Sequence, residues 1–381
     1  MQPSHLNNDY RLINEGLTDQ IDSDIKAKKQ RLFKEFEDSP EDPRTRRPKH
    51  SQSKTKKPPS GPQMDEFPSE ERPFAPFVAN TLKFEGKGNF VGQSVAYVEK
   101  HNLIIGCPNE SSLQAFDATT LLPRKEIKTE KLDDALVRMS FFPEAETLVL
   151  GCLDGQIYAY NLSNMNLRKI QKGRRKEIVA MTFLNSGYYA FSQYESFELL
   201  VGNLHNEDVL AFNLNGKDSF GLYNFPKRSL LFSTLQDSSI VIYRTDRLPK
   251  FPILYLNRDY KSQDWTKVLS LTIKGKDFIV TAGYDEKIQI WHLTKGKMKK
   301  LKGFSVQEGV VGMVYLENYK MLAVTFTGSS LKFFRFPSGK LESTLGLGMK
   351  YCQNIFLMKD KNALGVAGSN KNIVKIIQLH K

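Results

Sequence analysis

The sequence predicts an all-β fold, a seven-bladed β-propeller in which small four-stranded sheets stand in a ring. From about residue 78 onward, short runs of apolar, β-branched and aromatic residues alternate with clusters of Gly, Asn, Asp, Ser and Lys, which is typical of strands joined by tight turns. One pattern of two such runs returns about every forty residues, and four strands in that length make one blade. Seven blades fit residues 77–381.

The repeated unit is a pair of strands that we expect to form a hairpin. Leu103–Cys107 followed by Leu113–Asp117 recurs as Leu148–Cys152 followed by Ile157–Asn161. Another strand precedes each pair, and a more polar one follows most of them, which completes a blade. The later copies are Phe278–Gly283 with Ile288–His292, Met321–Thr325 with Leu331–Arg335, and Ala363–Gly368 with Val374–Gln378.

Two parts of the ring are less regular. The segment 178–256 offers enough strand-like runs for two blades, but Val209–Asn213 resembles an inner hairpin strand, whereas counting makes it an outer one, and Tyr188–Ser196 is then a candidate insertion. The last run ends at Leu379 and leaves the final blade one strand short. Because a ring of sheets is stable only when its ends are joined, we expect Thr81–Phe84 to supply the missing strand.

One blade carries a more specific motif. Thr281, a turn aspartate at Asp285 and a strand that ends in Trp291 follow the pattern of a WD repeat, and the chain resembles that family over about 300 residues through its periodicity. In the family a histidine joins the Ser or Thr, the Asp and the Trp in a hydrogen-bonded set, but no histidine stands in that place here. Asp154 and Asp237 occupy the turn position elsewhere, where Asp also stabilises a tight turn by bonding its own backbone. The residues at the tryptophan position of other blades are Phe116, Tyr160, Tyr243, Phe334 and Ile377, whose size suits packing between sheets.

The first 76 residues differ in texture from the rest. Within residues 1–37, Tyr10–Phe36 has no proline and spaces its apolar residues about four apart, which predicts an amphipathic helix. Because an isolated helix is marginal in water, this one is expected to dock either on a partner protein or on the propeller. Its apolar face consists of Ile13, Leu17, Ile21, Ile25, Leu32 and Phe36.

Residues 38–76 are rich in Pro, Ser, Lys, Arg and Glu, a composition typical of a disordered linker. Two basic clusters between Arg44 and Lys57 have a spacing that resembles a bipartite nuclear import signal; the alternative is a solvated linker that charge keeps extended. We therefore expect a cytoplasmic location, a nuclear one, or both.

Composition excludes several classes of protein. Apolar runs stay well short of the eighteen or so residues of a membrane span, and the first thirty residues lack a secretory signal pattern. Three scattered cysteines do not make a disulfide framework, which suits a reducing compartment. The formal net charge is +13, and because acids and bases balance in residues 1–76, the excess lies in the predicted propeller. Such a charge favours polyanions or acidic proteins as partners.

No catalytic motif is recognisable: there is no phosphate-binding glycine loop, nucleophile elbow, HExxH or cysteine pair. We expect no enzymatic activity, no metal and no cofactor. A propeller enzyme would need acids or histidines at equivalent positions of several blades, and none are found. The histidines, which are too dispersed for a metal site, are His5, His50, His101, His205, His292 and His380.

Two basic stretches lie inside the predicted propeller. The first fills the connection between the second and third blades, on a face where propellers often bind ligands, and it consists of Lys169, Lys172, Arg174, Arg175 and Lys176. It indicates a solvated loop, a site for an acidic protein, or a site for RNA, DNA or anionic lipid. The second lies on the outermost strand of the Trp291 blade, where lysines also prevent edge-to-edge aggregation, and it consists of Lys295, Lys297, Lys299, Lys300 and Lys302.

These observations lead to two functional hypotheses. The first is a non-catalytic scaffold or adaptor, a monomeric propeller that presents its faces and its N-terminal helix to protein partners within a multi-subunit assembly. The alternative is a component of a nuclear ribonucleoprotein or ribosome-biogenesis assembly that contacts RNA through its basic loops.

Overall fold

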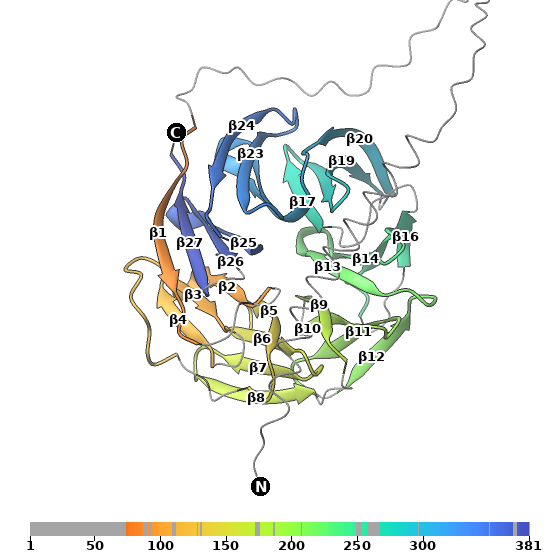
Figure 1. Cartoon of the computed structure of the whole chain (residues 1–381). Coiled ribbons are helices and arrows are strands. Elements are labelled where there is room, and N and C mark those ends of the chain that lie inside the picture. Colours follow the sequence, from red (N-terminus) through yellow and green to blue (C-terminus); the bar gives the residue numbers. More distant parts are fainter. Residues whose placement is uncertain are drawn as a thin grey trace, which may run out of the picture. The chain divides into compact units, whose positions relative to one another are not determined.

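The computed structural model describes residues 74–380 apart from gaps at 87–89, 91–92, 109–111, 128, 130–131, 172–175, 186, 207, 249–252, 258–266, 296, 350 and 369–371, and it describes only the backbone of 253–257. The described chain forms seven antiparallel sheets around a common axis (Figure 1). This confirms the predicted seven-bladed all-β propeller. The predicted helix in residues 1–37 and the basic clusters between Arg44 and Lys57 lie outside the described residues.

The strands follow one another in order within each blade, with the first strand nearest the axis (Figure 1). Blade 1 contains β2–β4, blades 2 to 6 contain four consecutive strands each from β5 to β24, and blade 7 contains β25–β27 together with β1. The strands are β1 (Phe77–Lys83), β2 (Val95–Val98), β3 (Leu103–Gly106), β4 (Gln114–Asp117), β5 (Leu136–Phe142), β6 (Thr147–Cys152), β7 (Ile157–Asn161), β8 (Asn166–Gln171), β9 (Ile178–Phe183), β10 (Tyr188–Gln193), β11 (Glu198–Asn203), β12 (Val209–Asn213), β13 (Ser219–Phe225), β14 (Leu230–Leu235), β15 (Ile240–Arg244), β16 (Ile253–Asn257), β17 (Lys267–Ile273), β18 (Lys276–Ala282), β19 (Lys287–Thr294), β20 (Lys297–Ser305), β21 (Val310–Leu316), β22 (Met321–Phe326), β23 (Ser330–Arg335), β24 (Leu341–Gly346), β25 (Cys352–Met358), β26 (Ala363–Gly368) and β27 (Ile373–Gln378).

Short 3-10 helices join the first and second strands of four blades. They are η1 (Glu99–His101), η2 (Pro226–Arg228), η3 (Glu317–Tyr319) and η4 (Lys359–Lys361). Each ends at a residue in the left-handed conformation, which reverses the chain into the second strand. No helix of the described residues is long and apolar enough to cross a membrane.

The ring is closed by an N-terminal strand, as the sequence predicts, but this strand is Phe77–Lys83 and not Thr81–Phe84. β1 pairs antiparallel with β27, from Phe77 opposite Gln378 to Lys83 opposite Ile373, and becomes the outermost strand of blade 7. Ahead of β1, the ring of Phe74 lies 5.1 and 4.9 Å from two aromatic rings of blade 6. The first and last segments of the propeller therefore belong to one blade.

In blade 3 the sequence left open which segment forms which strand, and the structure assigns each of them. Tyr188–Gln193 forms β10, the regular second strand of the blade, so the interpretation of Tyr188–Ser196 as an insertion is wrong. Val209–Asn213 is the outermost strand β12, as counting indicates. Its side chains are partly or fully exposed although most of them are apolar. The apolar character of one strand therefore does not show whether it is an inner or an outer strand of its blade.

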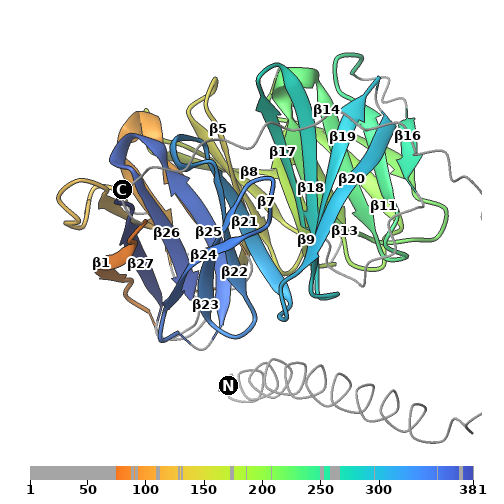
Figure 2. The same ribbon diagram turned by 90° about the horizontal axis from the view of Figure 1, so that it is seen from above.

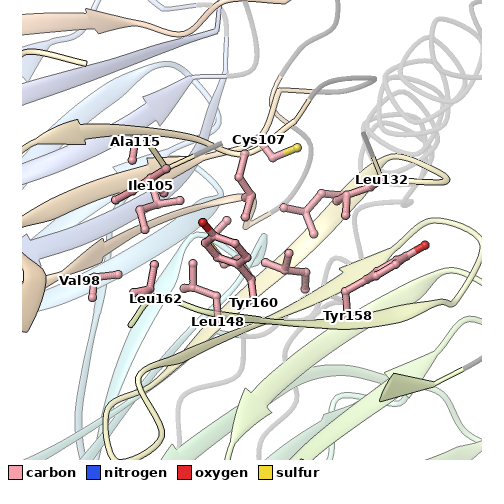
Figure 3. Close-up of a cluster of buried hydrophobic side chains, with 14 of the residues drawn as sticks. Val98, Ile105, Cys107, Ala115, Leu132, Leu148, Tyr158, Tyr160 and Leu162 are labelled. Atoms are coloured by element: carbon pink, nitrogen blue, oxygen red, sulfur yellow. The ribbon is translucent and has the colours of Figure 1, made fainter. Parts of the chain in front are cut away.

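Hydrophobic clusters fill every junction between neighbouring blades. In the cluster between blades 1 and 2, Tyr160 and Leu148 of blade 2 face Ile105 and Ala115 of blade 1 (Figure 3). Burying a large apolar side chain contributes roughly 1.5–3 kcal/mol. The residues at the tryptophan position take part in these junctions, with exposed fractions of 1% for Tyr160, 2% for Tyr243, 2% for Trp291, 5% for Phe334 and 0% for Ile377.

Part of the WD-type bonding is present in blade 5. The indole Nε1 of Trp291 donates a hydrogen bond of 2.9 Å to the hydroxyl of Thr281, and both residues are buried. In blades 2 and 4 the turn aspartates accept from the backbone two residues on: Asp154 from the N–H of Gln156 at 2.9 Å, and Asp237 from the N–H of Ser239 at 3.1 Å. Each turn is thus stabilised within its own blade.

Closure by β1 can be tested by truncation. A chain that begins at residue 74 keeps β1 and should melt as the full chain does. Deleting residues 1–84 also removes β1 and the buried Phe84, exposes the edge of β27, and should lower the melting temperature by about 10 °C or abolish the cooperative transition. Circular dichroism melting compares the two truncations, and equal melting would contradict closure.

Candidate interaction face

The strands run between two faces of the ring, seen edge-on in Figure 2. One face carries the turns between second and third strands together with the connections from blade to blade, and we call it the turn face. The two kinds of loop lie against each other: a Cβ on Gly155, in the β6–β7 turn, would lie 2.5 Å from the carbonyl oxygen of Lys176, in the β8–β9 connection. Loops held in this way on a rigid scaffold are suited to recognition.

The basic connection between blades 2 and 3 lies on this face, and its two described ends are engaged within the chain. Lys169 forms an ion pair of 2.7 Å with Asp133 and holds the pKa of that carboxyl below its usual value. Lys176 donates to the backbone carbonyl of Glu195 at 2.6 Å. The other members of the predicted cluster, which are Lys172, Arg174 and Arg175, lie outside the described residues.

The second basic cluster lies along β20, the outermost strand of blade 5. Lys297, Lys299, Lys300 and Lys302 are exposed, and in the described part of the chain none of them forms an ion pair. Lys295 stands in the turn before the strand with a φ of 50°. The structure thus separates the two basic clusters, one on the turn face and one on the outer edge of the ring.

The turn between β10 and β11 presents two aromatic side chains to solvent. Tyr194 is 50% exposed and Phe197 is 41% exposed. Glu195 and Phe197 have φ angles of 51° and 54°, the left-handed region, which costs roughly 1–2 kcal/mol for each residue that is not glycine. Side chains that combine apolar area with few rotatable bonds are favoured at protein interfaces.

A buried carboxylate holds this strained turn in place. Asp218, in the connection between blades 3 and 4, is 4% exposed and accepts from the N–H of Glu195 at 3.0 Å and from the N–H of Phe197 at 3.3 Å. Hydrogen bonds to an ionised acceptor are stronger than those between neutral groups. Asp218 thereby offsets the cost of the left-handed residues and fixes where Tyr194 and Phe197 point.

Tyr284 adds a third exposed aromatic residue to the turn face. It lies in the β18–β19 turn of blade 5, is 39% exposed, and rests against the backbone of Gly309 in the neighbouring connection. The sequence-based reasoning missed Tyr194, Phe197 and Asp218, because it treated the first of them as part of an insertion. The available signal was a turn of four residues between two apolar strands with no glycine or asparagine to adopt the left-handed conformation.

The described residues offer few groups for covalent or metal chemistry. No set of three or more His, Cys, Asp or Glu in this part of the chain is arranged to hold a metal ion. Cys107, Cys152 and Cys352 are buried, and none of them forms a disulfide. Burial raises the pKa of the Cys152 thiol and raises that of Cys352 to about 12, so both stay protonated at neutral pH.

Comparison with known proteins bears on the fold. No family model and no curated protein matches the chain. Among solved structures, the β-propeller domain of Cps50 (Swd1) from Myceliophteria thermophila is similar, with a TM-score of 0.67 at 11% sequence identity over 80% of this chain and 100% of that one. The chain thus shares the propeller fold of that domain.

The role of Asp218 can be tested locally. Asp218→Ala should leave the N–H groups of Glu195 and Phe197 without their acceptor, so their hydrogen exchange should accelerate at least tenfold while the melting temperature falls by only a few degrees. Asp154→Ala is the matched control, since Asp154 accepts hydrogen bonds from the backbone and side chain of Gln156 in its own blade, and it should leave these two amides unchanged. Unaltered hydrogen exchange of these two amides in Asp218→Ala would show that Asp218 does not hold the turn in place.

Proposed function

We propose that the protein is a non-catalytic scaffold or adaptor whose turn face binds protein partners within a multi-subunit assembly. The observation that carries this proposal is the turn of Tyr194–Phe197, a strained segment that displays two aromatic side chains and is held by a buried carboxylate. A turn with no external role has no need of exposed aromatic residues in a costly backbone conformation. The propeller fold supports the proposal, because it is rigid and presents many loops on one face.

We further propose that the segment Tyr10–Phe36 is a second contact. Two linked contacts raise the strength of binding through effective concentration, without a larger interface at either one. The basic clusters between Arg44 and Lys57 would allow such an assembly to form in the nucleus.

The alternative function is RNA contact through the connection that includes Arg174 and Arg175. The basic excess after residue 76 favours it. The ion pair of Lys169 with Asp133 counts against RNA contact at this end of the connection, because that charge is already neutralised within the chain.

Replacing the aromatic side chains tests the proposed face. The double variant Tyr194→Ser and Phe197→Ser should fold normally and should reduce the recovery of partner proteins at least tenfold in quantitative affinity purification, since a central aromatic residue of an interface contributes about 2 kcal/mol or more. Leu122→Ser, which changes a side chain 64% exposed beside blade 1, is the control and should retain them. Nuclease treatment separates the alternatives. Partners that are lost after nuclease treatment, and that are also lost in the double variant Arg174→Glu and Arg175→Glu, would favour the RNA function.

Deleting residues 1–40 tests the second contact. The propeller should melt as before, because this deletion leaves β1 and the following strands intact. At least one partner should be recovered less efficiently, by about tenfold or more for a tethered second contact. An unchanged set of partners at unchanged yield would show that the segment Tyr10–Phe36 serves no partner.

A further inference from the structure

Two cations lie at the same level of the ring near its axis. Arg138 stands in β5 opposite Gly151, one residue before the end of β6, and Lys267 begins β17 opposite Ala282, the last residue of β18. β5 and β17 are first strands of their blades and border the axis (Figure 1). Both residues are therefore near the turn face, and both side chains are partly buried.

The guanidinium of Arg138 is fixed in position by backbone carbonyls. Its Nε donates to the carbonyl of Val179 in blade 3 at 2.6 Å, and its Nη1 donates to the carbonyl of Val137 at 2.7 Å. A guanidinium has five N–H donors, so these bonds leave others available. Neutral carbonyls orient the group without neutralising its charge.

In the described part of the chain, neither Arg138 nor Lys267 has a carboxylate within ion-pair distance. Glu177, before β9, is near enough to Arg138 for their charges to interact; burial raises the pKa of its carboxyl and Arg138 counteracts that rise. The hydroxyl of Tyr223, on β13, is also within the electrostatic reach of Arg138. Among the described residues, one carboxyl beside two cations leaves a positive excess.

Burial makes this excess among the described residues unfavourable. Burial, together with the charge of Arg138, lowers the pKa of Lys267 to about 8, so the ammonium is still mainly protonated at neutral pH but is poorly stabilised. Partly buried charges in folded proteins are normally paired or hydrogen-bonded. A group that supplies negative charge would relieve both cations at once.

We propose that Arg138 and Lys267 form a binding site for a small free oxyanion, of the phosphate or carboxylate class, near the axis of the propeller. The planar fork of Arg138 suits the oxygen pair of such a group, and Lys267 supplies a second charge. Because both side chains keep only partial exposure, a small solute reaches them more readily than a macromolecular surface does. This site is independent of the protein contacts proposed for the turn face.

Thermal melting of the full chain with inorganic phosphate or acetate tests the site, with sodium chloride of equal ionic strength as the reference. Phosphate should raise the melting temperature of the wild type by about 3 °C more than that of Lys267→Met, because the anion binds the folded state. Without the anion, Lys267→Met should melt at the same or a higher temperature than the wild type, since it removes an unpaired charge. Lys302→Met, which removes the same charge from the exposed edge strand β20, should respond to phosphate as the wild type does.

A second variant, Arg138→Gln, and a direct measurement of phosphate binding test the site independently of Lys267→Met. Arg138→Gln retains a side-chain donor but loses the charge, and it should also lose the specific response to phosphate. Titration calorimetry should detect phosphate binding to the wild type and at least tenfold weaker binding to both variants. Equal stabilisation of the wild type and Lys267→Met, or the absence of calorimetric binding of both phosphate and acetate to the wild type, would overturn the proposal.

Discussion

Packing between neighbouring blades is the constraint on which the rest of this structure depends. Each sheet is covered on both faces by other sheets, and each junction is filled by apolar side chains such as Tyr160, Tyr243 and Phe334. A missing pairing at any one blade leaves two junctions exposed. The ladder between β1 and β27 is therefore as important as any part of the core, although it consists of main-chain hydrogen bonds at the rim.

A closed ring of this kind can carry local strain. The left-handed residues Glu195 and Phe197 persist because the strands on either side of the turn are fixed in blade 3 and because Asp218 reaches them from the next connection. The same argument applies near the axis, where Arg138 is held by a carbonyl of blade 3 while Lys267 comes from blade 5. In both places the groups that define a site come from different blades.

This origin in different blades explains how far the sequence could predict the molecule. Turn residues such as Asp154 are properties of one repeat, so its spacing predicts them. Counting the repeats predicts the number of blades and shows that the last blade lacks a strand. The register of blade 3 was ambiguous because its outer strand β12 is apolar. The partnership of Asp218 with the Tyr194–Phe197 turn, and the approach of Arg138 and Lys267, depend on how repeats are placed around the axis, which no single repeat encodes.

The closing ladder also determines how the propeller should respond to mechanical load. Phe77 and Gln378 are the first pair of the ladder, so a pull applied through the two ends acts on adjacent strands at one point. Two antiparallel strands that are pulled apart from the same end lose their hydrogen-bonded pairs one after another. They separate at a much lower force than strands that are sheared along their length. A partner that grips the turn face would instead spread the same force over several blades.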